Sequence, residues 1–132
     1  MKFDIHTDYA VRALRLLHTN EGEALTAMDI AVSIDTTSPI FTKIANKLKC
    51  AKLLKTVQGR GGGYVLGKPA HEISLYDVFT CIEGDLRINH CIETGGLCSH
   101  GEHVKCKAHS LFYGIQQDLV DKLSNVFISD LV

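Results

Sequence analysis

The sequence predicts a mostly α-helical (α+β) fold, a winged helix-turn-helix with a two-stranded wing and a long C-terminal dimerisation helix. Three observations predict it. Two short amphipathic segments flank a tight turn at residues 35–37, which is the arrangement of a helix-turn-helix. A glycine-rich stretch joins two strand-like segments directly afterwards. Apolar residues then recur every four positions after residue 106, as expected for one long amphipathic helix.

The first two helices are predicted from apolar periodicity and from their capping residues. Thr7 or Asp8 is a suitable N-cap for the first helix, because its side-chain oxygen accepts a hydrogen bond from an unpaired backbone N–H. Thr26 is the predicted N-cap of the second helix, with Asp29 at the position of a capping-box acid. The residues expected to face the core are Ala10, Ala13, Leu14 and Leu17 in the first helix and Met28, Ile30, Ala31 and Ile34 in the second.

The third helix and the wing complete the predicted DNA-binding unit. Ser38 is the expected N-cap of the third helix, and Pro39 is its first residue, where a proline costs no hydrogen bond. The segments 53–57 and 64–66 are predicted to pair as two strands, joined by the glycine-rich residues 58–63. This hairpin is the expected wing. The core-facing residues of the third helix are expected to be Ile40, Ile44 and Leu48.

Two further helices are expected beyond the wing. Ser74 is predicted to cap a fourth helix that ends at Gly84, and a long helix should begin near Lys107. Because one protomer offers little core to cover this long helix, we expect it to pack against a second copy of the chain. The apolar residues expected on the two helices are Leu75, Val78, Phe79 and Ile82, and then Leu111, Phe112, Ile115, Leu119, Val120 and Leu123.

Basic residues are concentrated in one acid-free block. The net charge is −1, yet residues 36–71 contain seven of the 14 basic residues and no acidic one. Such a block indicates a nucleic-acid phosphate backbone as the partner, because a merely solvated face normally mixes both signs. The third helix would enter the major groove and the wing the minor groove. The residues expected to contact double-stranded DNA are Ser38, Pro39, Thr42, Lys43, Lys47, Gln58, Arg60, Gly61 and Gly62.

Three late cysteines indicate a metal centre. Cys91, Cys98 and Cys106 lie seven and eight residues apart in a loop rich in glycine and histidine. An odd total of five cysteines in a reducing compartment favours metal binding or redox chemistry over structural disulfides. An iron-sulfur cluster is the favoured occupant. Two alternatives stay open: a zinc site completed by His109, and a metal-free switch in which two of these cysteines form a reversible disulfide.

Other chemistry has weaker support in the sequence. Residues 62–68 match the start of a phosphate-binding loop, but Pro69 stands where that pattern needs a hydroxyl group. No pair of nucleophile and base stands out, so we expect no enzyme, and a metal-dependent redox enzyme is the least favoured alternative. Cys50 and Cys81 have no close ligand-type neighbours in the sequence and are expected to be packed structural thiols.

The chain is expected to be a soluble cytoplasmic protein with no membrane partner. No apolar run approaches the roughly 18 residues that a membrane span needs. The first residues also lack the apolar stretch of a secretory signal.

A resemblance to a known family joins these features. The residues that carry it are Thr7-Asp8-Tyr9-Ala10, Ser38-Pro39, the wing Gly59-Arg60-Gly61-Gly62-Gly63-Tyr64, the segment Leu66-Gly67-Lys68-Pro69-Ala70, and the three late cysteines. Over nearly the whole chain, they resemble the family of bacterial winged-helix regulators that includes the iron-sulfur regulator IscR and the nitric-oxide sensor NsrR. The chain looks most similar to the NsrR-like members. Many relatives carry Arg where this chain has Gln58, directly before the first wing glycine.

The resemblance implies a homodimeric transcription regulator, acting as a repressor, whose binding to operator DNA depends on an iron-sulfur cluster. The cluster would be of the 4Fe-4S type, with 2Fe-2S as the alternative, and would sense nitric oxide, redox state or iron. Its ligands would be the three late cysteines and either Asp8 of the other subunit, as in NsrR-like members, or His109, as in IscR-like members. Without that role, Asp8 is an acid favoured by the dipole at a helix N-terminus. The expected divisions are a winged-helix DNA-binding domain at 1–84, a cluster-binding loop at 85–105, and a dimerisation helix with its tail at 106–132.

Overall fold

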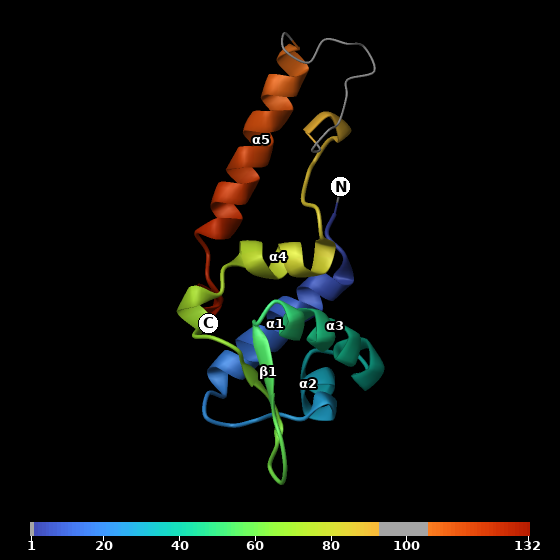
Figure 1. Ribbon diagram of the computed structural model, residues 1–132, viewed down its shortest axis with the longest axis vertical. Helices are drawn as coiled ribbons and strands as arrows, with labels where there is room; N and C mark the ends of the chain where they lie inside the picture. Colours follow the sequence, from blue (N-terminus) through green and yellow to red (C-terminus); the bar gives the residue numbers. More distant parts are fainter. Residues whose placement is uncertain (1, 93–105) are drawn as a thin grey trace.

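The computed structural model describes residues 2–92 and 106–132, and it has the predicted winged helix-turn-helix architecture. In Figure 1 the two-stranded wing lies at one end of the molecule and the long helix α5 projects from the other. The elements are α1 (Ile5–Thr19), α2 (Ala27–Ser33), α3 (Ser38–Cys50), β1 (Leu54–Val57), β2 (Gly63–Leu66), η1 (Ala70–Glu72), α4 (Leu75–Glu83), η2 (His90–Ile92), α5 (Lys107–Ser124) and η3 (Ile128–Leu131).

Helix α1 begins one turn earlier than predicted. Its N-cap is Asp4, whose carboxylate accepts a hydrogen bond from the backbone N–H of His6 at 2.8 Å. Thr7 therefore lies inside the helix and is almost completely buried, so the prediction that Thr7 or Asp8 caps α1 was wrong. Helix α3 likewise begins at Ser38, and its N-cap is Thr37 instead of Ser38. The predicted N-caps Thr26 and Ser74 are confirmed, and each accepts a backbone N–H of its own first turn.

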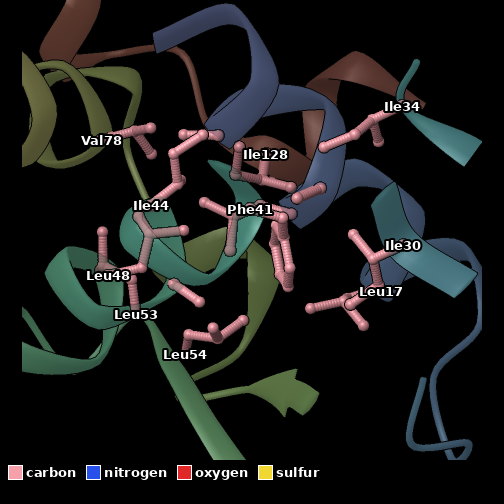
Figure 2. Packing of buried hydrophobic residues seen from close by; sticks show 14 of the residues in the cluster. Leu17, Ile30, Ile34, Phe41, Ile44, Leu48, Leu53, Leu54, Val78 and Ile128 are labelled. Carbon is pink, nitrogen blue, oxygen red and sulfur yellow. The ribbon is translucent and has the colours of Figure 1, made fainter. Parts of the chain in front are cut away.

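Phe41 lies at the centre of the hydrophobic core. Figure 2 shows its ring surrounded by side chains from α1, α2 and the C-terminal segment. The ring is fully buried and meets the Tyr64 ring edge to face, with 5.3 Å between centroids. The prediction that Ile40 and Met28 face the core was wrong. Ile40 is only partly buried, because Phe41 takes its place, and Met28 is 67% exposed. Helix α3 therefore packs with Phe41, Ile44, Ala45 and Leu48.

The wing is an antiparallel hairpin with an additional bridge to the segment before α2. Strand β1 pairs with β2 in the register Leu54↔Leu66 to Val57↔Gly63. Tyr64 also forms an antiparallel bridge with Leu25, with two backbone hydrogen bonds of 2.7 and 3.1 Å. Gly63 packs so closely on the Leu25 backbone that a Cβ atom at this position would overlap its carbonyl group. The base of the wing is therefore fixed to the helix-turn-helix.

The chain returns to the winged-helix core after α5. Ile128 is fully buried, and its backbone N–H donates to the Ile73 carbonyl at 2.9 Å. The Leu75 N–H donates to the Val126 carbonyl at 2.8 Å. By contrast, Leu111 and Ile115 in the first half of α5 are 62% and 44% exposed. None of the described helices is long and apolar enough to cross a membrane.

We predict that Phe41→Ala lowers the free energy of unfolding by about 3–5 kcal/mol, because it leaves a cavity in the packed core. Urea denaturation followed by circular dichroism measures this loss. The matched control is Met28→Ala, whose exposed side chain should change stability by no more than about 0.5 kcal/mol. Similar losses in the two variants would contradict the placement of Phe41 at the centre of the core.

Candidate functional site

The predicted DNA contacts on α3 share one accessible surface. Ser38 is partly exposed, while Pro39, Thr42, Lys43 and Lys47 are exposed. The core residues of α3 lie on the opposite side, so the apolar stripe itself directs these side chains outwards. The Thr42 hydroxyl donates to the Ser38 carbonyl at 2.8 Å, which fixes that side chain against the first turn. The surface carries positive charge and small polar groups, as a groove-facing helix requires.

The turn at the wing tip needs backbone conformations that glycine adopts readily. Gly59 and Gly61 have φ values of 91° and 75°, a region that residues with a side chain rarely adopt. The Gly62 N–H donates to the Gly59 carbonyl at 3.0 Å, and a Cβ atom on Gly62 would overlap the Val57 carbonyl. Arg60 is exposed at this turn. Gln58 and Gly61 are also exposed, and Gly62 is partly exposed.

Lys47 has a second contact that the sequence did not suggest. Its ammonium group donates a long hydrogen bond, 3.5 Å, to the backbone carbonyl of Ile82 near the end of α4. A cation at a helix C-terminus is favoured by the helix dipole. Lys47 therefore connects α3, the helix predicted to contact DNA, to the end of α4. Lys43, one turn earlier on the same helix, is also exposed.

Glu83 joins the ends of α1 and α4. One of its carboxylate oxygens accepts the backbone N–H of Asp4 at 2.7 Å and the hydroxyl of Thr7 at 2.6 Å. Glu83 and Thr7 are 76 residues apart, so no local sequence pattern could have revealed this contact. The bonds hold the first turn of α1, which carries Asp8, against the end of α4.

Two of the three late cysteines lie in the described residues. Cys91 is part of η2, which packs against α5, and its sulfur accepts a hydrogen bond from the Asn89 side-chain amide at 3.0 Å. Figure 1 shows η2 beside α5. Cys106 is the N-cap of α5, where unpaired backbone N–H groups and the helix dipole favour negative charge. Both residues are partly buried. Cys98 lies outside the described residues.

The two candidates for a fourth ligand lie in different parts of the chain. Asp8 is exposed on α1 and forms an ion pair with Arg12 at 2.7 Å. His109 is partly buried on the first turn of α5, three residues after Cys106, and its ring stacks on Tyr113. Within residues 2–92 and 106–132 of one chain, no three His, Cys, Asp or Glu side chains are grouped to hold a metal ion.

Cys50 and Cys81 lie near each other where α3 packs on α4. The Cys81 thiol donates to the backbone carbonyl of Lys47 at 3.2 Å. Burial raises the pKa of the Cys81 thiol, the Lys47 charge opposes this, and a negative charge on nearby Cys50 adds to it. Cys50 is exposed at the last turn of α3. Both thiols were expected to be packed structural residues; Cys81 is partly buried between the helices, whereas Cys50 is exposed, so the prediction was wrong for Cys50.

The fold and its exposed basic surface define a winged-helix DNA-binding protein. Residues 3–132 match the Rrf2 family model, described as iron-dependent transcriptional regulator, and the chain belongs to this family. It is 30% identical to the HTH-type transcriptional regulator IscR of Pectobacterium carotovorum over 126 residues, which covers 94% of this chain and 74% of that protein.

Solved structures show the same fold. CymR (YrzC), the global cysteine regulator of B. subtilis, superposes with a TM-score of 0.81 at 22% identity, covering 99% of this chain and 95% of that one. T. potens IscR superposes with a TM-score of 0.78 at 20% identity, covering 99% of this chain and 85% of that one. The protein is thus a DNA-binding transcription regulator similar to IscR, which confirms the family resemblance and the expectation that it is not an enzyme.

We predict that Glu83→Ala lowers the free energy of unfolding by about 1–3 kcal/mol, because the buried Thr7 hydroxyl loses its charged acceptor. Glu83→Gln keeps an acceptor oxygen, so its free energy of unfolding should fall less than that of Glu83→Ala. Urea unfolding of both variants measures the difference. Glu72→Ala, at an exposed acid of η1, is the control and should stay within about 0.5 kcal/mol of the parent. A loss in Glu72→Ala equal to that in Glu83→Ala would argue against this junction.

Proposed function

We propose that this regulator is a homodimeric repressor, acting in the cytoplasm, whose operator binding is controlled by an iron-sulfur cluster. The cluster is held by Cys91, Cys98 and Cys106, and it senses nitric oxide, redox state or iron. A 4Fe-4S cluster is favoured, with 2Fe-2S as the alternative. The expected DNA contacts are those on the exposed face of α3 and at the wing tip.

The observation that carries the proposal is the setting of Cys91 and Cys106. The sulfur of Cys91 accepts an amide N–H bond from Asn89, and such bonds commonly support a metal-bound thiolate and adjust the potential of a cluster. Cys106 stands at the positive end of an 18-residue helix. Because η2 packs on α5, the two thiolates belong to neighbouring segments. The described residues therefore fit an anionic, thiolate-ligated group.

The exposed face of α5 supports a homodimer. Leu111, Tyr113 and Ile115 are 62%, 51% and 44% exposed, and apolar groups of this size are favourably covered by another protein surface. A second copy of the chain is the occupant we propose, since a twofold dimer matches a palindromic operator.

The proposed dimer also bears on the fourth ligand. Asp8 is on the surface of α1, where a partner's cysteine loop could reach it after its ion pair with Arg12 opens. His109 would instead come from the same chain as Cys106. An oxygen ligand holds iron less firmly than a thiolate, so the Asp8 arrangement leaves one iron open to a small molecule such as nitric oxide.

The first test asks whether the protein carries iron and sulfide. The parent, Cys91→Ser and Asp8→Ala are purified without oxygen, and their visible absorption, iron and acid-labile sulfide are measured. We expect a brown parent and loss of iron, sulfide and colour in Cys91→Ser. Asp8→Ala should keep the cysteines but show an altered spectrum if Asp8 is the fourth ligand. Cys50→Ser is the matched control and should remain brown.

Other results of this test would select the alternatives. A colourless parent that contains zinc would overturn the cluster and favour the zinc site with His109. A colourless parent without metal would favour the thiol switch among the late cysteines.

The second test concerns the DNA contacts, with a duplex selected by this protein from a random-sequence library. We predict that Lys43→Ala weakens binding and reduces the slope of log K against log salt by about 1, because one phosphate contact is lost. Fluorescence anisotropy at several salt concentrations measures the slope. Lys122→Ala removes the same charge from the last turn of α5 and should leave the slope unchanged. Equal slopes for the parent and Lys43→Ala would contradict the proposed contact.

A further inference from the structure

The cysteines outside the late loop form a pair at the interface of α3 and α4. Cys81 belongs to α4, and its thiol donates to the backbone carbonyl of Lys47 in α3 at 3.2 Å. Cys50 is the last residue of α3, three positions after Lys47. The two thiols therefore lie beside the same helical turn, although they are 31 positions apart in the sequence.

Helix geometry limits the separation of this pair. In an α-helix the carbonyl oxygen of residue i lies about 3.5 Å from the Cα atom of residue i+3. The Lys47 carbonyl has this relation to Cys50, and it also accepts the Ala51 N–H at 3.2 Å, as expected in a regular last turn. The Cys81 sulfur is therefore no more than about 7 Å from the Cys50 Cα atom. The electrostatic effect of Cys50 on Cys81 agrees with this proximity.

Disulfide formation from this arrangement requires the Cys50 sulfur to turn towards α4. Bonded cysteines usually have Cα atoms about 4.4–6.8 Å apart. Cys50 is exposed at the last turn of a helix, where one side-chain torsion and slight movement of that turn bring its sulfur towards α4. Cys81 is partly buried and is already directed at α3 by its bond to Lys47.

We propose that Cys50 and Cys81 form a reversible disulfide that acts as a thiol switch on the DNA-facing helix, separate from the cysteines of the late loop. The oxidant is a hydroperoxide. The Cys50 thiolate attacks the peroxide, the O–O bond breaks, and Cys50 becomes a sulfenic acid as water or an alcohol leaves. The Cys81 thiolate then attacks the Cys50 sulfur and displaces its hydroxyl group as water. The two thiols give up two electrons, and the hydroperoxide accepts them.

The disulfide would weaken DNA binding through the position of α3. It removes the thiol proton that Cys81 donates to the Lys47 carbonyl and draws the last turn of α3 towards α4. Lys43 and Lys47 are on this helix, and both are proposed to contact phosphate or base groups. Such a displacement of the groove-facing side chains lengthens these contacts in both halves of a dimer.

Peptide mapping tests the disulfide directly. The full-length protein is treated with hydrogen peroxide, its remaining thiols are blocked with N-ethylmaleimide, and it is digested with trypsin. We expect residues 50–52 linked to residues 61–87 within one chain, and the link should disappear on reduction. The link should persist in Cys91→Ser and be lost in Cys50→Ser and in Cys81→Ser. Recovery of Cys50 and Cys81 as separate peptides, or their linkage to late-loop cysteines instead, would overturn the proposal.

A binding measurement tests the switch apart from the late loop. Cys91→Ser is oxidised with hydrogen peroxide, and its Kd for the library-selected duplex is compared with that of the reduced form. We expect oxidation to raise Kd about fivefold or more, the scale of a coupling of this kind, and dithiothreitol to restore it. The double variant Cys50→Ser/Cys91→Ser should not respond. An unchanged Kd in a sample whose disulfide is confirmed by mass would refute the switch. Because both variants carry Cys91→Ser, the difference between their responses to peroxide reports on Cys50 alone.

Discussion

The end of α4 is the constraint on which the arrangement of the other helices depends. Three consecutive residues there bind two different helices: Cys81 and Ile82 contact Lys47 of α3, and Glu83 binds the first turn of α1. The Glu83 bonds are charge-assisted and one of their donors is the buried Thr7 hydroxyl, so breaking them leaves a desolvated polar group. This junction links α3 to α1 through α4, in addition to the direct apolar packing of α1 on α3.

The same junction lies between the segment that carries Cys91 and the surface proposed to contact DNA. Directly after α4 the chain passes through residues 84–89 to η2, where Cys91 lies. The backbone N–H of Ile88 donates to the buried side chain of Gln116 at 2.9 Å, which ties this segment to α5. A change at the cysteines is thus connected to α3 through a short, bonded series of elements.

Sequence patterns predicted those features that depend on neighbouring residues. The bounds of α4 follow from Ser74 and Gly84, and the wing follows from its glycines, because capping and turn chemistry are local. The predictions failed where contacts between residues distant in the sequence determine burial and packing. Ile40 and Phe41 are adjacent apolar residues, and Phe41 is the buried one because side chains from distant segments, Tyr64 among them, surround its ring. The burial of Ile128 required the chain to return to the core after α5, and the bond from the Cys81 thiol to the Lys47 carbonyl required α3 to pack on α4.

Lys47 shows why a list of basic residues does not describe the DNA-binding surface. An ammonium group has three N–H donors, so the bond to the Ile82 carbonyl leaves two for a phosphate group. The cation would then bridge the end of α4 and the DNA, and its position would follow any movement of that end. Lys43 has the same charge and lies on the same helix, but it is not bound to the α4 end in this way. A change at the junction would then alter DNA binding mainly through Lys47. Lys43 would contribute an electrostatic attraction to DNA that depends on the salt concentration and not on the junction.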